Sequence, residues 1–168
     1  MKERLVTQDI TDALFELLKT KELADITVTE LIKKAGVCRA SFYRHFYLTK
    51  DVIRQCGFAM YEEINRTIPL EQGGIREHLL ALSSYMWTHR ERLALIEKRG
   101  LYYLLEDSTL EQCLYQLQRM NVWTNRYQAE FYAGGITKLI RRWLRNGCEE
   151  SPQEFSDILC DLIFLDRM

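Results

Sequence analysis

The chain has few residues that break helices and none of the patterns that mark secretion or membrane insertion. Only two prolines, Pro69 and Pro152, occur in 168 residues. Alternation of β-branched residues is rare, whereas helical spacing of apolar residues recurs throughout. No apolar run approaches the roughly 20 residues that a helix needs to cross a bilayer. The acid-bearing N-terminus lacks the apolar centre of a secretory signal. These absences predict an all-α, cytoplasmic protein.

Cysteine and histidine are too scattered to form a recognisable metal or catalytic site. The five cysteines include no C-x-x-C pair, which predicts free thiols and excludes the common zinc patterns. The three histidines lie in no H-E-x-x-H motif, glycine-rich phosphate loop or nucleophile elbow. We therefore expect no enzymatic activity, no metal and no cofactor. A redox role for Cys38 stays open, because the neighbouring Arg39 favours a thiolate.

Positive charge is concentrated in one short segment of a nearly neutral chain. The net charge is −1 and the pI is about 6.3, which argues against a protein that coats nucleic acid non-specifically. Residues 31–50 nevertheless contain five lysines or arginines and no acid. A basic segment in a balanced chain indicates that one face contacts a polyanion.

The same segment has the sequence signals of a helix-turn-helix. Thr27 and Glu30 form a capping box at the start of a short helix. Gly36 ends this helix, because glycine accepts the positive φ of a helix C-terminus. A second short helix over about residues 39–46 buries its two phenylalanines. In a helix-turn-helix, the second helix enters the major groove of DNA.

Helical spacing also extends on both sides of this motif. A first helix covers roughly residues 3–19, and a fourth runs from near Thr49 past Ile64 and ends before Pro69. The segment 69–74 contains a proline and two glycines and is the best boundary. We predict a DNA-binding domain, a connecting helix and a second helical domain over residues 1–48, 49–68 and 69–168.

The outward side of the second short helix supplies residues that suit base edges and phosphates. Arginine reads guanine, alanine contacts a thymine methyl, and serine bonds to several bases. The expected base readers are Arg39, Ala40, Ser41 and Arg44. Phosphate contacts position a protein without reading sequence. They are assigned to Tyr43, His45, Lys50 and Thr27.

At these residues the chain resembles the TetR family of bacterial transcriptional regulators. The matching motifs are T-V-T-E-L-I-x-x-A-G-V, S-F-Y-R-H-F and K-D-x-I, within roughly the first 65 residues. The resemblance implies the same base and phosphate contacts and adds Thr29 beside Thr27. The family usually has two residues between the phenylalanine and the lysine, whereas three precede Lys50 here. One of the three, Thr49, is expected to cap the fourth helix.

The last two helices resemble those of one branch of the family, where they form a four-helix dimer interface. Gly134 and Gly135 destabilise a helix interior by on the order of 1 kcal/mol each, which makes sense where another backbone approaches closely. Ser151 and Glu154 form a capping box between the two helices. The alternative is that both helices pack only within one chain. The predicted interface comprises Gly135, Ile136, Leu139, Trp143, Phe155, Leu159 and Leu162.

The middle of the chain is rich in aromatic residues with polar tips. In the family, the equivalent helices enclose an effector pocket, and such rings can line a cavity. The candidate pocket residues are Trp87, Tyr103, Trp123 and Phe131. Ordinary core packing is the alternative reading of this group.

Together these features predict a homodimeric regulator that binds a palindromic operator on double-stranded DNA. Repression that is released by a small-molecule effector is the default implied by the resemblance. One alternative is an activator controlled by a protein partner. Another is a helical interaction module without DNA binding, which would show no salt-dependent affinity for any duplex.

Overall fold

The computed structural model describes residues 2–68, 74–119 and 125–164, and every regular element in them is helical. The helices in chain order are α1 (Lys2–Leu18), the short 3-10 helix η1 (Leu23–Asp25), α2 (Val28–Ala35), α3 (Arg39–His45), α4 (Thr49–Thr67), α5 (Ile75–Thr88), α6 (Arg90–Lys98), α7 (Tyr103–Arg119), α8 (Arg126–Arg145) and α9 (Pro152–Phe164).

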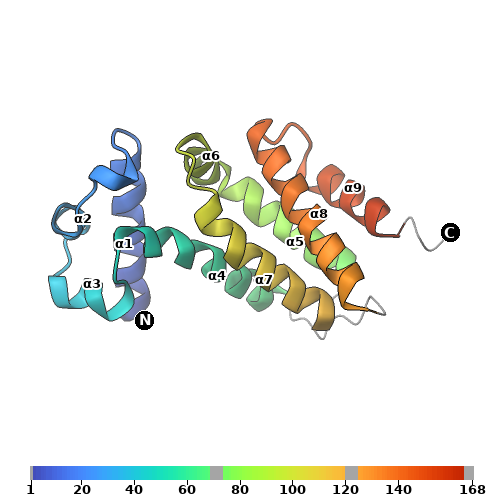
Figure 1. Ribbon diagram of the computed structural model, residues 1–168, viewed down its shortest axis with the longest axis horizontal. Coiled ribbons are helices and arrows are strands. Elements are labelled where there is room, and N and C mark those ends of the chain that lie inside the picture. Colours follow the sequence, from blue (N-terminus) through green and yellow to red (C-terminus); the bar gives the residue numbers. More distant parts are fainter. Residues whose placement is uncertain (1, 69–73, 120–124, 165–168) are drawn as a thin grey trace.

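The helices form two groups at opposite ends of an elongated molecule. Figure 1 shows α1, α2 and α3 at one end and α8 and α9 at the other, with α4 leading from the first group into the second. Helix α1 packs against α2, α3 and α4. In the second group α5 packs on α9, and α7 lies between α4 and α8. The predicted all-α class and the N-terminal three-helix unit are therefore confirmed.

The N-terminal unit has an apolar core of its own, to which each of its helices contributes. Burying an aliphatic or phenylalanine side chain of this kind contributes about 1.5–3 kcal/mol. The fully or almost fully buried members are Ile10, Leu14, Leu18, Leu31, Phe42, Phe46, Val52 and Ile53.

Local hydrogen bonds explain where α2 and α9 begin. The Thr27 hydroxyl accepts from the Glu30 amide at 3.1 Å, as predicted, but the Glu30 carboxylate pairs with Lys21 and does not complete the box. Both bonds of the second predicted box, between Ser151 and Glu154, are present at 2.8 and 3.3 Å.

The predicted bounds of α4 hold, but the prediction that Thr49 caps this helix was wrong. Thr49 is its first residue, and the Asp51 carboxylate accepts the amides of Tyr47 and Leu48 at 3.2 and 2.8 Å.

Gly36 ends α2 in the left-handed conformation, with φ of +67°. A Cβ at this position would meet no atom within 4 Å, so a side chain is disfavoured by the backbone alone. We expect Gly36→Ala to lower the free energy of unfolding by about 1 kcal/mol. Gly36→Asn should lower it less, because asparagine tolerates this conformation. Urea denaturation of both variants checks the prediction, and equal losses would contradict the backbone explanation.

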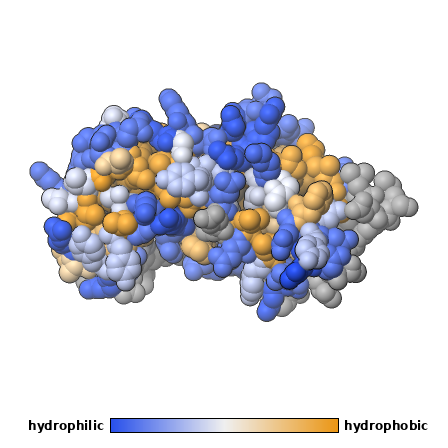
Figure 2. Space-filling view, viewed as in Figure 1, coloured by the Kyte–Doolittle hydropathy of each residue, from blue (hydrophilic) through white to orange (hydrophobic). Residues whose placement is uncertain are grey.

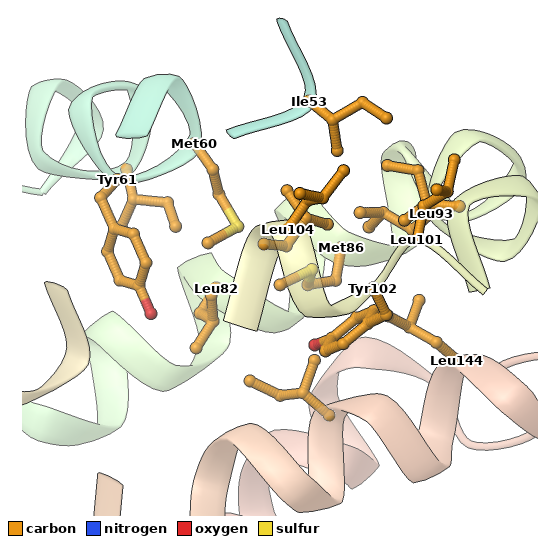
Figure 3. Close-up of a cluster of buried hydrophobic side chains, with 14 of the residues drawn as sticks. Ile53, Met60, Tyr61, Leu82, Met86, Leu93, Leu101, Tyr102, Leu104 and Leu144 are labelled. Carbon is orange, nitrogen blue, oxygen red and sulfur yellow. The ribbon is translucent and has the colours of Figure 1, made fainter. Parts of the chain in front are cut away.

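Helix α4 belongs to the cores of both groups. Its first half buries Val52 and Ile53 with the N-terminal unit, and its second half buries Met60, Tyr61 and Ile64. Figure 3 shows Met60 and Tyr61 on one side of a shared interior that also contains side chains of α5, α7 and α8. The Tyr61 hydroxyl donates to the carbonyl of Thr109 in α7 at 3.3 Å. A displacement of α4 would therefore disturb the packing of both groups.

Candidate nucleic-acid interface

Helix α3 is held in place by its two phenylalanines. Phe42 is completely buried and Phe46 is 2% exposed, as the sequence predicted. Their ring centres lie 5.7 Å apart, and the rings of Phe42 and Tyr43 are nearly perpendicular, with centres 5.4 Å apart. Because these residues occupy the inner face, the remaining side chains of α3 must point outward or sideways.

The predicted base readers lie on that outer face. Arg39, Ala40 and Arg44 are exposed, and Ser41 is half-buried. Tyr43 is exposed, with the Arg39 guanidinium 5.6 Å from the centre of its ring and 3.4 Å from its hydroxyl. This contact stiffens two long side chains on one turn of the helix.

The predicted phosphate contacts surround α3 on three elements. Thr27 and Thr29, at the start of α2, are exposed, so the free amides of this helix end are accessible to an anion. His45, at the end of α3, and Lys50, in the first turn of α4, are half-buried. Lys50 borders a surface hollow that Leu48 and Tyr103 also line.

The positive charge of this surface is not neutralised by the protein itself. Among the described residues, no carboxylate forms an ion pair with Arg39, Arg44 or Lys50. Most of the other arginines are paired, for example Arg54 with Asp51 at 3.1 Å. The basic segment therefore remains free to bind phosphates and base edges.

Cys38 immediately precedes α3 and is exposed. Its thiol lies 3.1 Å from the Ser41 hydroxyl, and this contact, followed by the backbone amides of Ser41 and Ala40, lowers the pKa of the thiol. The sequence had suggested Arg39 as the cause, but that guanidinium lies over Tyr43.

The residues predicted for the effector pocket lie in different surroundings in the structure. Trp87 packs against Trp143, with ring centres 6.2 Å apart. Phe131 is 76% exposed, and Tyr103 borders the hollow beside Lys50. Trp123 lies outside the described residues. Aromatic composition did not distinguish core and surface rings from cavity-lining ones.

The structure instead contains a cleft of about 740 Å³ between the N-terminal unit and helices α4 to α7. Its polar lining includes Tyr85, His89 and Arg92, which sequence reasoning did not select. Their spacings of four and three resemble those of one helical face, but α5 ends at Thr88 and α6 begins at Arg90, so periodicity gave no usable signal.

Most of the predicted dimer residues lie in the chain's own core. Ile136, Trp143, Phe155 and Leu159 are at most 5% exposed, and the ring of Trp143 stacks on Phe155 at 4.3 Å. They cannot form an interface with a second copy, because α5 and α7 already cover that side of α8 and α9.

A different stripe of α8 and α9 faces outward. Leu162 is 42% exposed, Gly135 is exposed and Leu139 is half-buried, so these three predicted residues remain accessible. Figure 2 shows hydrophobic surface near the C-terminal end of the molecule. The large exposed apolar side chains of the two helices are Tyr127, Phe131, Ile158 and Leu162.

Two other classes of site find no support in the part of the chain that the structure describes. None of the helices there has the length and apolar character needed to pass through a bilayer. Within the same residues, no three side chains of histidine, cysteine, aspartate or glutamate gather as metal ligands would.

Similarity to known proteins agrees with this architecture. Residues 97–165 match the TetR_C_8 family, described as a transcriptional regulator C-terminal region. The chain is 24% identical over 170 residues to the uncharacterized HTH-type transcriptional regulator YxbF of Bacillus subtilis. This alignment covers 94% of the chain but 44% of YxbF, so the chain spans less than half of that relative's length.

Two solved structures share the fold over almost the whole chain. The dihydroxyacetone kinase operon activator DhaS is 16% identical with a TM-score of 0.68, covering 96% of this chain and 95% of its own. NalD, the secondary repressor of the MexAB-OprM efflux pump in Pseudomonas aeruginosa, is 18% identical with a TM-score of 0.64, covering 98% and 96%. The N-terminal motifs, the match of residues 97–165 and this shared fold make the chain similar to transcriptional regulators of the TetR family.

Proposed function

We propose that this chain is a homodimeric, sequence-specific DNA-binding regulator that inserts α3 into the major groove. The observation that supports this most directly is the outer face of α3. Its arginines are exposed and have no acidic partner in the described part of the chain, while its phenylalanines hold the helix in place from the inner side. Arg39, Ala40, Ser41 and Arg44 read bases in this proposal. Phosphates are bound by Thr27, Thr29, Tyr43, His45 and Lys50.

Repression released by a small-molecule effector is the mode of action we favour, in the cytoplasm and without catalysis. The cleft between the two groups of helices supports it, because a ligand there would contact α1 and α4 as well as α5 and α6. Activation is the second candidate, since the structural neighbour DhaS is named an operon activator.

A second copy of the chain is proposed to cover the exposed stripe of α8 and α9. Tyr127, Phe131, Ile158 and Leu162 supply apolar area there. Gly134 and Gly135 are exposed and have open space around them, so a second backbone can approach closely. A two-fold dimer presents two α3 helices and reads a palindromic site with half-sites about one or more helical turns apart.

Selection of bound fragments from bacterial genomic DNA tests the proposal and yields the operator. We expect a shared palindrome whose log affinity falls linearly with log salt, because phosphate binding releases counterions. Absence of any salt-dependent duplex binding would instead support a helical interaction module.

Two substitutions on α3 should have different effects on the selected site. Arg44→Ala should weaken binding by about 1–3 kcal/mol and relax preference at particular base pairs. Tyr43→Phe keeps the ring against Phe42 and removes only the hydroxyl. Tyr43→Phe should weaken binding to all DNA sequences by the same factor. Binding to a panel of single-base operator variants distinguishes the two patterns, and a uniform loss in Arg44→Ala would contradict base reading by this residue.

A further inference from the structure

The cleft between the N-terminal unit and the second group has an apolar floor and a size suited to a small molecule. Its volume of about 740 Å³ lies within the range of ligand pockets. Figure 3 shows Met60 of α4 and Met86 of α5 reaching toward the same interior. The buried apolar side chains that line the cleft include Phe15, Met60, Met86, Leu93, Ile96 and Leu105.

Three polar side chains from α5, from α6 and from the junction between them line one part of this cleft. The rings of Tyr85 and His89 lie 4.2 Å apart. Burial raises the pKa of Tyr85 to about 12, so its hydroxyl remains a donor at neutral pH. Burial also lowers the pKa of His89, which favours a neutral imidazole. Arg92 is therefore the group among these three that carries a full charge.

The Arg92 guanidinium uses only part of its hydrogen-bonding capacity within the described residues. Its guanidinium lies 5.2 Å from the centre of the Phe15 ring and donates to one carboxylate oxygen of Asp12 in α1. No other acceptor is recorded for it among the described residues, although a guanidinium has five N–H groups. Both partners are partly exposed, at 40% and 47%. A second carboxylate can therefore approach Arg92, and Asp12 can be solvated by water when it is displaced.

The other charged residues of the cleft do not offer an equivalent cationic position beside the apolar floor. Arg66 pairs with Glu62 at 3.9 Å on the surface of α4. Arg44 belongs to the exposed face of α3. Glu63 is exposed, and its charge opposes the effect of burial on His89. Glu63 makes an organic cation the competing ligand class.

The Arg92–Asp12 pair connects the start of α6 to the DNA-binding unit, and a second set of polar contacts follows the end of this helix. Arg99, directly after α6, donates to the carbonyls of Leu18 and Lys19 at 2.8 and 3.0 Å and pairs with Glu22. Thus α1 is tied to both ends of α6. A ligand that takes Arg92 from Asp12 would release one of these connections and leave the other.

We propose that the cleft binds an amphipathic carboxylate whose tail lies on the apolar floor and whose head group replaces Asp12 on Arg92. Ligand binding thereby loosens α1 from α6. The regulatory part of this inference rests on the proposed function as a DNA-binding regulator, whereas the binding part does not.

Calorimetric titration of the DNA-free protein with decanoate tests the binding part. Arg92→Gln should weaken decanoate binding about tenfold or more, because charge-assisted hydrogen bonds are lost. Asp12→Asn should tighten it several-fold, because the competing carboxylate is gone. Arg76→Gln is the matched control, since Arg76 forms an ion pair of similar or greater exposure with Asp157 between α5 and α9. It should change the affinity less than twofold.

Opposite effects of the two partners are the decisive result. If Arg92→Gln and Asp12→Asn weaken binding alike, the pair has only a structural role and the proposal is wrong. Titration with decyltrimethylammonium, which has the same tail length, gives the second comparison. Stronger binding of this cation that is lost in Glu63→Gln would also overturn the proposal.

A titration of the selected operator fragment tests the regulatory part. Decanoate should lower the DNA affinity of the wild-type protein by up to about fivefold, because an exposed ion pair contributes at most about 1 kcal/mol. Asp12→Asn should bind DNA more weakly from the start and respond little to decanoate. If the protein binds no DNA but the two variants change decanoate binding as expected, the proposed function is wrong and the ligand site is supported. If the protein binds DNA but not decanoate, this inference is wrong and the proposed function is unaffected.

Discussion

Trp143→Ala is expected to lower the free energy of unfolding by about 3–5 kcal/mol, the range for removing a buried aromatic side chain. Trp143 is 2% exposed and stacks on Phe155, with ring centres 4.3 Å apart and an angle of 10° between the planes. Its indole N–H donates to the carbonyl of Glu150 at 3.1 Å. Alanine leaves a cavity between α8 and α9 and an unpaired acceptor in the turn that joins them.

Guanidinium chloride denaturation of Trp143→Ala measures this loss, and Tyr115→Ala is the matched control. Tyr115 is an aromatic residue of α7 that is 49% exposed, so its removal should change stability by less than about 0.5 kcal/mol. A similar, small loss in both variants would mean that Trp143 is not a core residue. It would restore the interface role that the sequence suggested.

The DNA-binding unit was predictable because its signals are local. A hydroxyl that caps α2, a glycine with positive φ and two phenylalanines four residues apart fix the path of residues 27–46. Each of these features depends on neighbours within about four residues in the chain. The outward position of Arg39 and Arg44 follows from the burial of the phenylalanines, and the structure has both arginines exposed.

The second group was less predictable because periodicity identifies an apolar stripe without showing what covers it. On α8, the stripe containing Ile136 and Trp143 is buried by helices of the same chain. The outer stripe, with Phe131 and two glycines, has weaker apolar periodicity. Phe131 was therefore assigned to the effector pocket, whereas the glycines were assigned to the close approach of a second backbone.

The cleft could not be located from the sequence, because its key pair joins residues 80 positions apart, Asp12 and Arg92.

Phe131→Asp is expected to convert the proposed dimer into monomers. Phe131 is 76% exposed at the centre of the outer stripe, between Tyr127 and the two glycines of α8. In a two-fold interface the same patch occurs on both partners, so one substitution places two carboxylates in the contact. Burying unpaired charges is strongly unfavourable. The helix itself should form normally, because the side chain of residue 131 is in solvent in the single chain.

Loss of the dimer should also abolish most DNA binding, because the second α3 then no longer binds at high effective concentration. Such linkage raises overall affinity by about 10²- to 10⁴-fold, and Phe131→Asp should lose a factor in that range on the palindrome. Its affinity for an isolated half-site should stay unchanged. Tyr115→Asp places the same charge at an exposed aromatic position of α7 and should stay dimeric. Sedimentation equilibrium and operator titration measure both effects. A Phe131→Asp protein that sediments as a dimer would exclude the outer stripe as the interface. A monomer that keeps full operator affinity would exclude cooperative reading by two α3 helices.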